Sequence, residues 1–146
     1  FGSRTHPPCL GVDPWTLQFI AQSPSYPPMA QKVHITISRA TNLPNADGGW
    51  FSGKSDPFCT VQVPGKTEPV CKTATVNDSL NPTWDEKFNI EWDGRSNLTF
   101  SVWDEDFAKA ADFLGTCQIS PAEIKKGFKG SKPLTSKKAS KAVPTL

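Results

Sequence analysis

The stretch LTFSVWDEDFAKAADFLG occupies residues 98–115 of the 146-residue chain. Its first third alternates apolar residues at 98, 100 and 102 with polar residues at 99 and 101, which is the period-2 pattern of a half-buried β-strand. Acidic residues interrupt this pattern from Asp104, and a second apolar run begins at Phe113. The stretch therefore predicts two strands joined by an acidic loop.

The same alternation recurs along the chain and predicts further short strands, which cover residues 33–38, 59–63, 71–76, 87–92 and 114–119. Turn dipeptides separate these runs, as at Pro64-Gly65 and Asp93-Gly94. Ser120, Pro121 and Glu123 have the spacing of an N-cap, a first helical residue and a capping-box glutamate, which predicts a short helix ending by Gly127. Many short strands with turns between them indicate an all-β, antiparallel Greek-key sandwich.

The acidic loop contains three carboxylates that should face one small volume. Asp104 and Asp106 leave the first strand on the same side, and Asp112 returns from the other end of the loop. Their mutual repulsion would raise their pKa values unless a cation compensates it. Ca²⁺ prefers oxygen ligands and tolerates irregular geometry. A second acidic group, Asp47 and Asp56, flanks an earlier glycine-rich loop and could lie at the same end of the sandwich.

Four motifs in this order resemble the C2 domain family: Leu43-Pro44-x-x-Asp47, then Lys54-Ser55-Asp56-Pro57-Phe58, then Leu80-Asn81-Pro82-Thr83-Trp84, and last the stretch from Trp103 to Gly115. The resemblance implies an eight-stranded sandwich with calcium-binding loops at one end. It assigns calcium ligation to the side chains of Asp47, Asp56, Asp104, Asp106 and Asp112, completed by the backbone carbonyls of Gly48 and Glu105. It also implies that the bound ions attract anionic phospholipid head groups, and it gives Asn81, Pro82 and Trp84 a structural role.

The chain divides into a proline-rich arm, residues 1–30, and a C2 domain, residues 31–146. Within the arm, residues 15–21 are the one segment with strand character, and they could dock on the edge of the domain or belong to a linker. Leu134 and residues 142–146 could supply a last edge strand. Which of the two segments completes the sandwich stays open at this point.

Aromatic and basic residues near the loops are candidates for membrane contact. Trp50 and Phe51 stand in a glycine-flanked loop, where they either cover the end of the sandwich or insert at the bilayer interface, a depth that tryptophan favours. Phe107 is a parallel candidate in the acidic loop. Lys66 and Lys72 lie near the position at which many C2 domains carry a basic patch for phosphoinositides.

Composition excludes other classes of function. The net charge of +2 gives no case for nucleic acid as a partner, and no apolar run approaches the roughly 20 residues of a spanning helix. No nucleophile motif or phosphate-cradling loop is present in the sequence, so we expect no enzymatic activity.

Cys59 and Cys117 are expected to be buried thiols. A bridge between Cys59 and Cys71 stays open on sequence alone.

The sequence thus predicts a module that binds anionic phospholipid membranes in a calcium-dependent manner and targets a larger protein to them. The expected location is cytoplasmic, at the membrane periphery, with an exported setting as an alternative because Asn77-Asp78-Ser79 is a formal glycosylation sequon. A calcium-independent protein-interaction module is the alternative function. The parent protein could itself be an enzyme that uses this domain for targeting.

Overall fold

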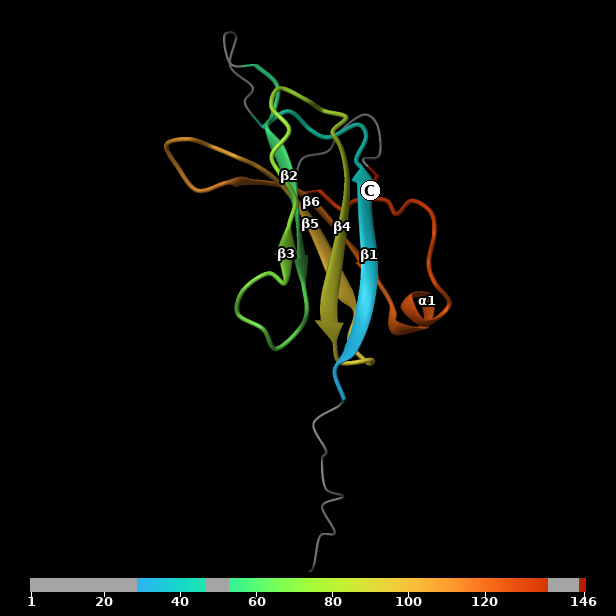
Figure 1. Cartoon of the computed structure of the whole chain (residues 1–146). Coiled ribbons are helices and arrows are strands. Elements are labelled where there is room, and N and C mark those ends of the chain that lie inside the picture. The colour runs from blue at the N-terminus through green and yellow to red at the C-terminus, as the bar shows by residue number, and fades with distance from the viewer. Residues whose placement is uncertain (1–28, 47–52, 137–144) are drawn as a thin grey trace, which may run out of the picture.

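The computed structural model describes residues 29–46, 53–136 and 145–146. Two antiparallel sheets face each other across one core (Figure 1). One sheet pairs two strands and the other has the order β3-β2-β5-β6. The elements in chain order are β1 (Gln31–Arg39), β2 (Pro57–Gln62), β3 (Cys71–Lys72), β4 (Thr83–Trp92), β5 (Leu98–Asp104), β6 (Asp112–Ile119) and α1 (Pro121–Lys125).

The core forms where the alternating apolar residues of both sheets meet. Trp92 of β4 and Leu98 of β5 are each about 1% exposed, and Val61 and Val102 are completely buried. Trp92 directs its indole N–H to the carbonyl of Ser96 at 2.7 Å, so the one polar group of this large side chain keeps a partner inside. Buried side chains from β2, β4 and β5 therefore form the centre of the core.

The all-β prediction is confirmed, and all but one of the expected strands are present with bounds shifted by a few residues. The strand predicted over residues 71–76 is mostly wrong, because regular pairing is confined to β3. The Thr73 hydroxyl accepts the N–H of Cys59 at 2.9 Å and so takes the place of a ladder carbonyl. The backbone nevertheless stays beside β2, since Val76 donates its N–H to the carbonyl of Pro57 at 3.0 Å.

The predicted short helix is confirmed in its capping chemistry. Ser120 is the N-cap, Pro121 opens the helix, and Glu123 completes a capping box by accepting the N–H of Ser120 at 2.9 Å. Lys132 contacts the Glu123 carboxylate at 2.5 Å, and this contact is the first cause of a Glu123 pKa lowered to about 2. Among the described residues, no helix has the length and apolar character needed to cross a bilayer.

The structural motif around Asn81 and Pro82 is confirmed. The Asn81 side-chain oxygen accepts the N–H of Asn42 at 2.9 Å, and Pro82, which is fully buried, offers its carbonyl to Ala40 at 3.0 Å. Trp84 packs against the core. This turn therefore ties the start of β4 to the chain that leaves β1.

Three cysteines lie in the described part of the chain, and none of them forms a disulfide. Cys59 is completely buried and Cys117 nearly so, as expected, and Cys71 is partly buried. The open question of a Cys59–Cys71 bridge is answered by register, because Cys71 stands opposite Val61. Burial raises the pKa of the Cys117 thiol to about 11, which keeps it protonated and unreactive near neutral pH.

The described residues contain six of the eight strands that the resemblance implies, and the full number stays a prediction. Leu134 is buried but forms no strand. Thr145 makes antiparallel bridges to Thr41 and Pro133, so the last described residues reach the end of β1. Residues 15–21 lie outside the described part of the chain.

Candidate functional site

Three neighbouring strands bring their acidic ends to one edge of the larger sheet. Asp104, the last residue of β5, pairs in register with Pro57 of β2 on one side and with Asp112 of β6 on the other. Asp56 directly precedes Pro57. The β5–β6 hairpin projects from this edge as the orange loop at the upper left of Figure 1. Sheet register therefore places Asp56, Asp104 and Asp112 at the same end of the sandwich.

Aromatic packing holds the base of this hairpin. The Trp103 and Phe113 rings meet edge to face with their centroids 5.3 Å apart, and the Trp103 indole N–H donates to Thr60 Oγ1 at 2.9 Å. The strands are thus fixed up to the residues that carry the carboxylates.

A relay of backbone hydrogen bonds orients the carboxylates. Asp104 Oδ1 accepts the N–H of Asp56, Asp56 Oδ1 accepts the N–H of Asp78, and Asp78 Oδ1 accepts the N–H of Lys54, each at 2.6 Å. A Cβ at Gly53 would lie 2.7 Å from Asp78 Oδ1, so this glycine leaves space for the last acceptor. Hydrogen bonds from N–H groups stabilise the charged form of a carboxylate. One oxygen of each aspartate in the relay is therefore held by backbone.

Lys109 lies between two of the predicted ligands. Its ammonium is 2.9 Å from Asp112 Oδ2 and 3.2 Å from Asp106 Oδ2. The hydrogen bond to Asp112, followed by that to Asp106, raises the pKa of Lys109 above its usual range. Asp106 Oδ2 is buried and makes no hydrogen bond of good geometry, and it faces the Lys109 ammonium in the 3.2 Å ion pair. The ammonium thus compensates part of the negative charge of the loop.

Glu105 faces a different direction from its neighbours. Its carboxylate accepts the Thr75 hydroxyl, and the Lys72 ammonium lies 3.6 Å from it. These contacts lower the pKa of Glu105, with the Thr75 hydrogen bond as the largest cause. Lys72 also stands 3.8 Å above the centre of the Phe58 ring. The Glu105 side chain therefore joins the loop to β3, while its backbone stays beside the aspartates through an N–H that donates to the Asp56 carbonyl at 2.9 Å.

The structure brings some of the predicted site together and leaves part of it undescribed. Asp47, Gly48, Trp50 and Phe51 lie outside the described residues. Phe107 is fully exposed on the loop between Asp106 and Lys109, and Lys66 is exposed in its turn. In the described ranges, no three acidic, histidine or cysteine side chains converge closely enough to hold a metal ion.

Sequence reasoning missed two residues of this site, Lys109 and Asp78. Lys109 stands three residues from both Asp106 and Asp112, which is a visible signal for an ion pair in a tight loop. Asp78 is 22 residues from Asp56 in the chain and has a positive φ of 54°, a conformation that aspartate tolerates in turns. No short-range pattern connects Asp78 to the acidic loop.

The donor chemistry of these residues fits a hard divalent cation. Asp56, Asp104, Asp106 and Asp112 offer oxygen ligands alone, and Ca²⁺ takes 6–8 such oxygens. The buried Asp106 Oδ2, which faces an ammonium, is an oxygen at which a cation is favoured. An ion at this place would have to replace or displace Lys109.

Comparison with known proteins bears on this arrangement. The model of the C2 domain family matches residues 31–135. The chain belongs to the C2 domain family. The match covers the strands, the acidic loop and the helix, so the resemblance seen in the four motifs is confirmed.

Relatives of this C2 domain are longer proteins. Multiple C2 and transmembrane domain-containing protein 2 of Mus musculus is 33% identical over 138 residues, which cover 82% of this chain and 15% of that protein. Synaptotagmin-5 of Arabidopsis thaliana is 30% identical over 97 residues, covering 65% of this chain and 17% of that protein. The chain spans between 7% and 17% of the length of the first curated relatives it matches.

Solved structures share the fold at lower identity. The calcium-bound pair of C2 domains from Extended-Synaptotagmin 2 superposes with a TM-score of 0.62 at 24% identity, over 79% of this chain and 42% of that one. A single C2 domain of plant Extended Synaptotagmin 1 gives a TM-score of 0.63 at 23% identity, over 78% of this chain and 89% of that one. At this identity the comparison establishes the C2 fold of the chain.

Proposed function

We propose that this C2 domain is a calcium-dependent module that binds anionic phospholipid membranes. One observation carries the proposal: the fully exposed Phe107 projects from the loop whose carboxylates hold an ammonium between them. An apolar ring beside a charge-compensated acidic site can enter a bilayer interface once the loop no longer repels anionic lipid.

Calcium would be held by the oxygens at the end of the larger sheet. The ligands in this proposal are the side chains of Asp47, Asp56, Asp104, Asp106 and Asp112 and the backbone carbonyls of Gly48 and Glu105. When bound, Ca²⁺ supplies positive charge that attracts anionic head groups and open coordination positions for their oxygens. The backbone relay through Asp104, Asp56 and Asp78 supports this role because it orients the carboxylates before any ion arrives.

Membrane contact in this proposal is shared by apolar and basic side chains. Phe107, with Trp50 and Phe51 of the other loop, would supply apolar burial at the interface. Lys66 and Lys72 would approach anionic head groups. The contacts of Lys72 with Glu105 and Phe58 leave less of its charge for lipid, so Lys66 should contribute more of the two.

Co-sedimentation with vesicles of phosphatidylserine and phosphatidylcholine, with and without calcium, tests the proposal. We expect binding with calcium on acidic vesicles and little binding without it. Phe107→Ala should weaken the calcium-dependent binding about tenfold, because partial burial of a phenylalanine contributes about 1.5 kcal/mol. Met29→Ala is the matched control, since Met29 is 88% exposed but precedes β1 at the opposite end of the domain (Figure 1). Equal loss in both variants would contradict insertion by the loop.

Asp106→Asn separates the calcium step from the apolar step. The variant keeps the size of the side chain and removes one charge that the proposal gives to calcium. Vesicle binding should fall even at saturating calcium if the ion bridges this residue to lipid. Unchanged binding at saturating calcium would refute the bridge.

A calcium-independent protein-interaction module is the second candidate, and one observation favours it. The ion pairs of Lys109 with Asp106 and Asp112 compensate part of the negative charge of the loop, so the loop can present a stable surface that does not require calcium. Such a module would show no calcium-dependent shift in vesicle binding and would bind a protein partner equally in calcium and in a chelator.

The proposed setting is a larger protein that this domain targets to membranes, at the membrane periphery and facing the cytoplasm. The small share of the relatives that the chain spans supports a larger parent. We propose a binding role and no catalytic role for the domain itself, and no role in nucleic-acid binding.

A further inference from the structure

Lys72 lies on the outer face of the larger sheet, at the end of a row of aromatic side chains. Phe58 pairs in register with Trp103, and Trp103 pairs with Phe113, so the three side chains share one face across β2, β5 and β6. The Lys72 ammonium is 3.8 Å from the centre of the Phe58 ring. Because the ring attracts the ammonium, the row holds a positive charge close to the acidic loop.

Glu105 supplies the negative charge that faces Lys72. Its carboxylate is 3.6 Å from the ammonium and also accepts the Thr75 hydroxyl. The backbone of Glu105 is held separately, because its N–H donates to the Asp56 carbonyl at 2.9 Å. Both charged side chains are 48% exposed, so solvent reaches the ammonium and the carboxylate alike. The carboxylate therefore occupies a position at which an external anion could contact Lys72 and Thr75.

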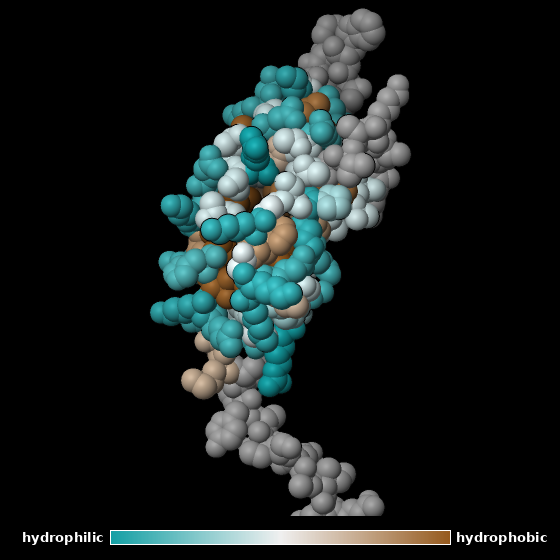
Figure 2. All heavy atoms as spheres, turned by 90° about the vertical axis from the view of Figure 1, so that its right-hand side faces the viewer, coloured by the Kyte–Doolittle hydropathy of each residue, from teal (hydrophilic) through white to brown (hydrophobic). Residues whose placement is uncertain are grey.

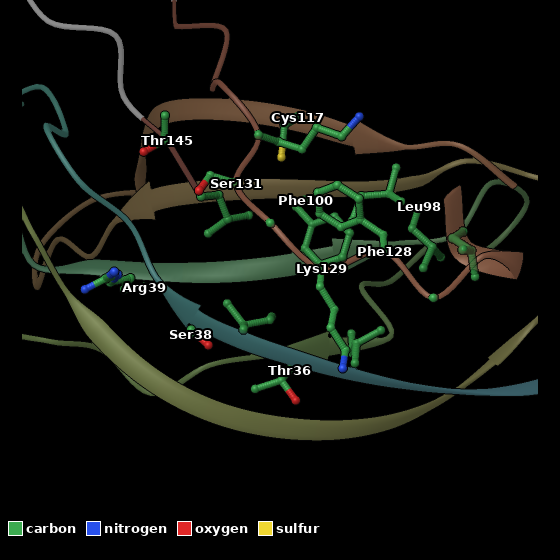
Figure 3. Close-up of a pocket in the computed structure, with 18 of the residues that line it drawn as sticks. Thr36, Ser38, Arg39, Leu98, Phe100, Cys117, Phe128, Lys129, Ser131 and Thr145 are labelled. Atoms are coloured by element: carbon green, nitrogen blue, oxygen red, sulfur yellow. The ribbon is translucent and has the colours of Figure 1, made fainter. Parts of the chain in front are cut away.

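A second lysine shows the contrast. Lys129 follows α1, which lies on the other side of the domain from β3 (Figure 1). It lines a groove of about 770 Å³, and no acidic side chain is among the described residues that line this groove. Figure 2 shows this face, with hydrophilic side chains around an apolar hollow, and in Figure 3 the Lys129 side chain extends toward β1. Lys72 differs because an acidic side chain of the same protein faces it.

We propose that Glu105 is an internal competitor at Lys72 and restricts this lysine to lipid head groups that carry a phosphate monoester. This role depends on the membrane function proposed above and concerns the lipid selectivity of the same surface. A carboxylate of the same chain has an effective concentration on the order of millimolar or more at the ammonium. An external anion must therefore bind better than the carboxylate in order to displace it.

The charge of the external anion decides whether it displaces Glu105. A phosphodiester head group carries a single negative charge on its phosphate, so it would exchange one monoanion for another with little gain. A phosphate monoester carries a charge of about −1.5 to −2 near pH 7 and has three acceptor oxygens. It attracts the ammonium more strongly and can also accept the Thr75 hydroxyl. Glu105 thus makes Lys72 selective for the monoester.

Vesicle binding by the full chain in a calcium chelator tests the proposal. The vesicles contain phosphatidylcholine with either phosphatidic acid, a monoester, or phosphatidylglycerol, a phosphodiester, at matched surface charge. The wild type should prefer phosphatidic acid. Glu105→Gln removes the charge and keeps an oxygen for Thr75. Because an exposed ion pair is weak, this variant should bind phosphatidylglycerol about threefold more tightly and gain less on phosphatidic acid, so the preference narrows.

Further variants show where the gain arises. Lys72→Met keeps an apolar stem over Phe58 and should abolish the lipid preference. Adding Glu105→Gln to Lys72→Met should give no further gain, which a double-mutant cycle measures as coupling between the two residues. Two controls, Glu91→Gln on β4 and Lys129→Met beyond α1, remove the same charges at exposed positions. Each control should change binding to the two lipids by the same factor.

Four results would overturn the proposal. An unchanged lipid preference in Glu105→Gln means that the carboxylate does not compete. A gain that persists in the Lys72→Met background, or that Glu91→Gln reproduces, assigns the effect to net charge. Absence of binding to both vesicles by every variant means that Lys72 takes no lipid. Isothermal titration in which inorganic phosphate alone binds the wild type but not Lys72→Met assigns the site to free phosphate. Failure of the calcium-dependent function is a separate result, since calcium is absent from every arm.

Discussion

Replacement of Lys109 by methionine should tighten calcium binding. The ammonium of Lys109 lies 2.9 Å from Asp112 Oδ2 and 3.2 Å from Asp106 Oδ2, so it would compete with the proposed calcium ion for both oxygens. The Lys109 side chain is 57% exposed, and solvent screens its attraction to the two carboxylates. Exposed ion pairs are weak, and we therefore expect a gain in calcium affinity of about two- to fivefold.

Isothermal titration with calcium at low ionic strength measures this effect. Lys126→Met is the matched control, because it removes the same charge from an exposed position beyond the helix. Lys109→Arg, which keeps the cation, should bind calcium close to the wild-type level. The gain from Lys109→Met should also shrink at high salt, on the order of 0.5 M, because salt screens exposed charges.

Three outcomes would contradict the competition argument or the proposed function, and they can be told apart. Calcium binding by Lys109→Met that is equal to or weaker than that of the wild type would refute competition by the ammonium. Absence of calcium binding in the wild type and in both Lys109 variants would instead contradict the calcium-dependent function. A gain shared by the Lys126→Met control would mean that net charge, and not the position of Lys109, sets the affinity.

Three further predictions concern stability. Asp104→Ala should lower the free energy of unfolding by about 1–3 kcal/mol in urea denaturation, because the Asp56 N–H loses its acceptor, whereas Asp104→Asn, which keeps an oxygen, should lose less. Gly115→Ala should cost about 1 kcal/mol or more by the same assay, since a Cβ there would lie 3.0 Å from a buried leucine side chain. The Glu123 pKa is lowered to about 2 by Lys132, so its contribution to stability is complete above the unfolded value of about 4.3 and is lost as the pH falls toward 2. Lys132→Met should flatten this acid-induced loss in a pH series of urea midpoints.

The strands that alternate apolar and polar residues could be predicted from local periodicity because each of them packs one face on the core. The β1 and β5 segments alternate apolar and polar residues over most of their length, and the structure has both. The segment after Cys71 misled the same reasoning, because the Thr73 side chain replaces a backbone acceptor there. When a side-chain oxygen replaces a backbone carbonyl as the acceptor in a sheet, the alternation of apolar and polar residues does not change. The sequence pattern therefore cannot reveal such a replacement.

The acidic site could be predicted only in part, for a different reason. Asp104 and Asp112 lie at the ends of β5 and β6, so their positions follow from the predicted strands. The pairing of β2 with β5 places Asp56 next to them. The contact of Asp56 with Asp78 arises from the path of a loop that no alternation describes. The position of Lys109 depends on how tightly its loop turns, and a lysine in an exposed loop is more often solvated than paired.

The relay of backbone hydrogen bonds orients the carboxylates at the acidic end of the sandwich. Asp104 is completely buried, and a buried carboxylate is costly unless donors surround it. The N–H of Asp56 meets part of that need, and the chain of acceptors continues through Asp78 to Lys54. Because backbone groups hold one oxygen of each relay aspartate, an arriving cation would find the carboxylates already oriented. The reorganisation left for calcium binding would then be concentrated in the displacement of Lys109, where the loop carries its exposed aromatic ring.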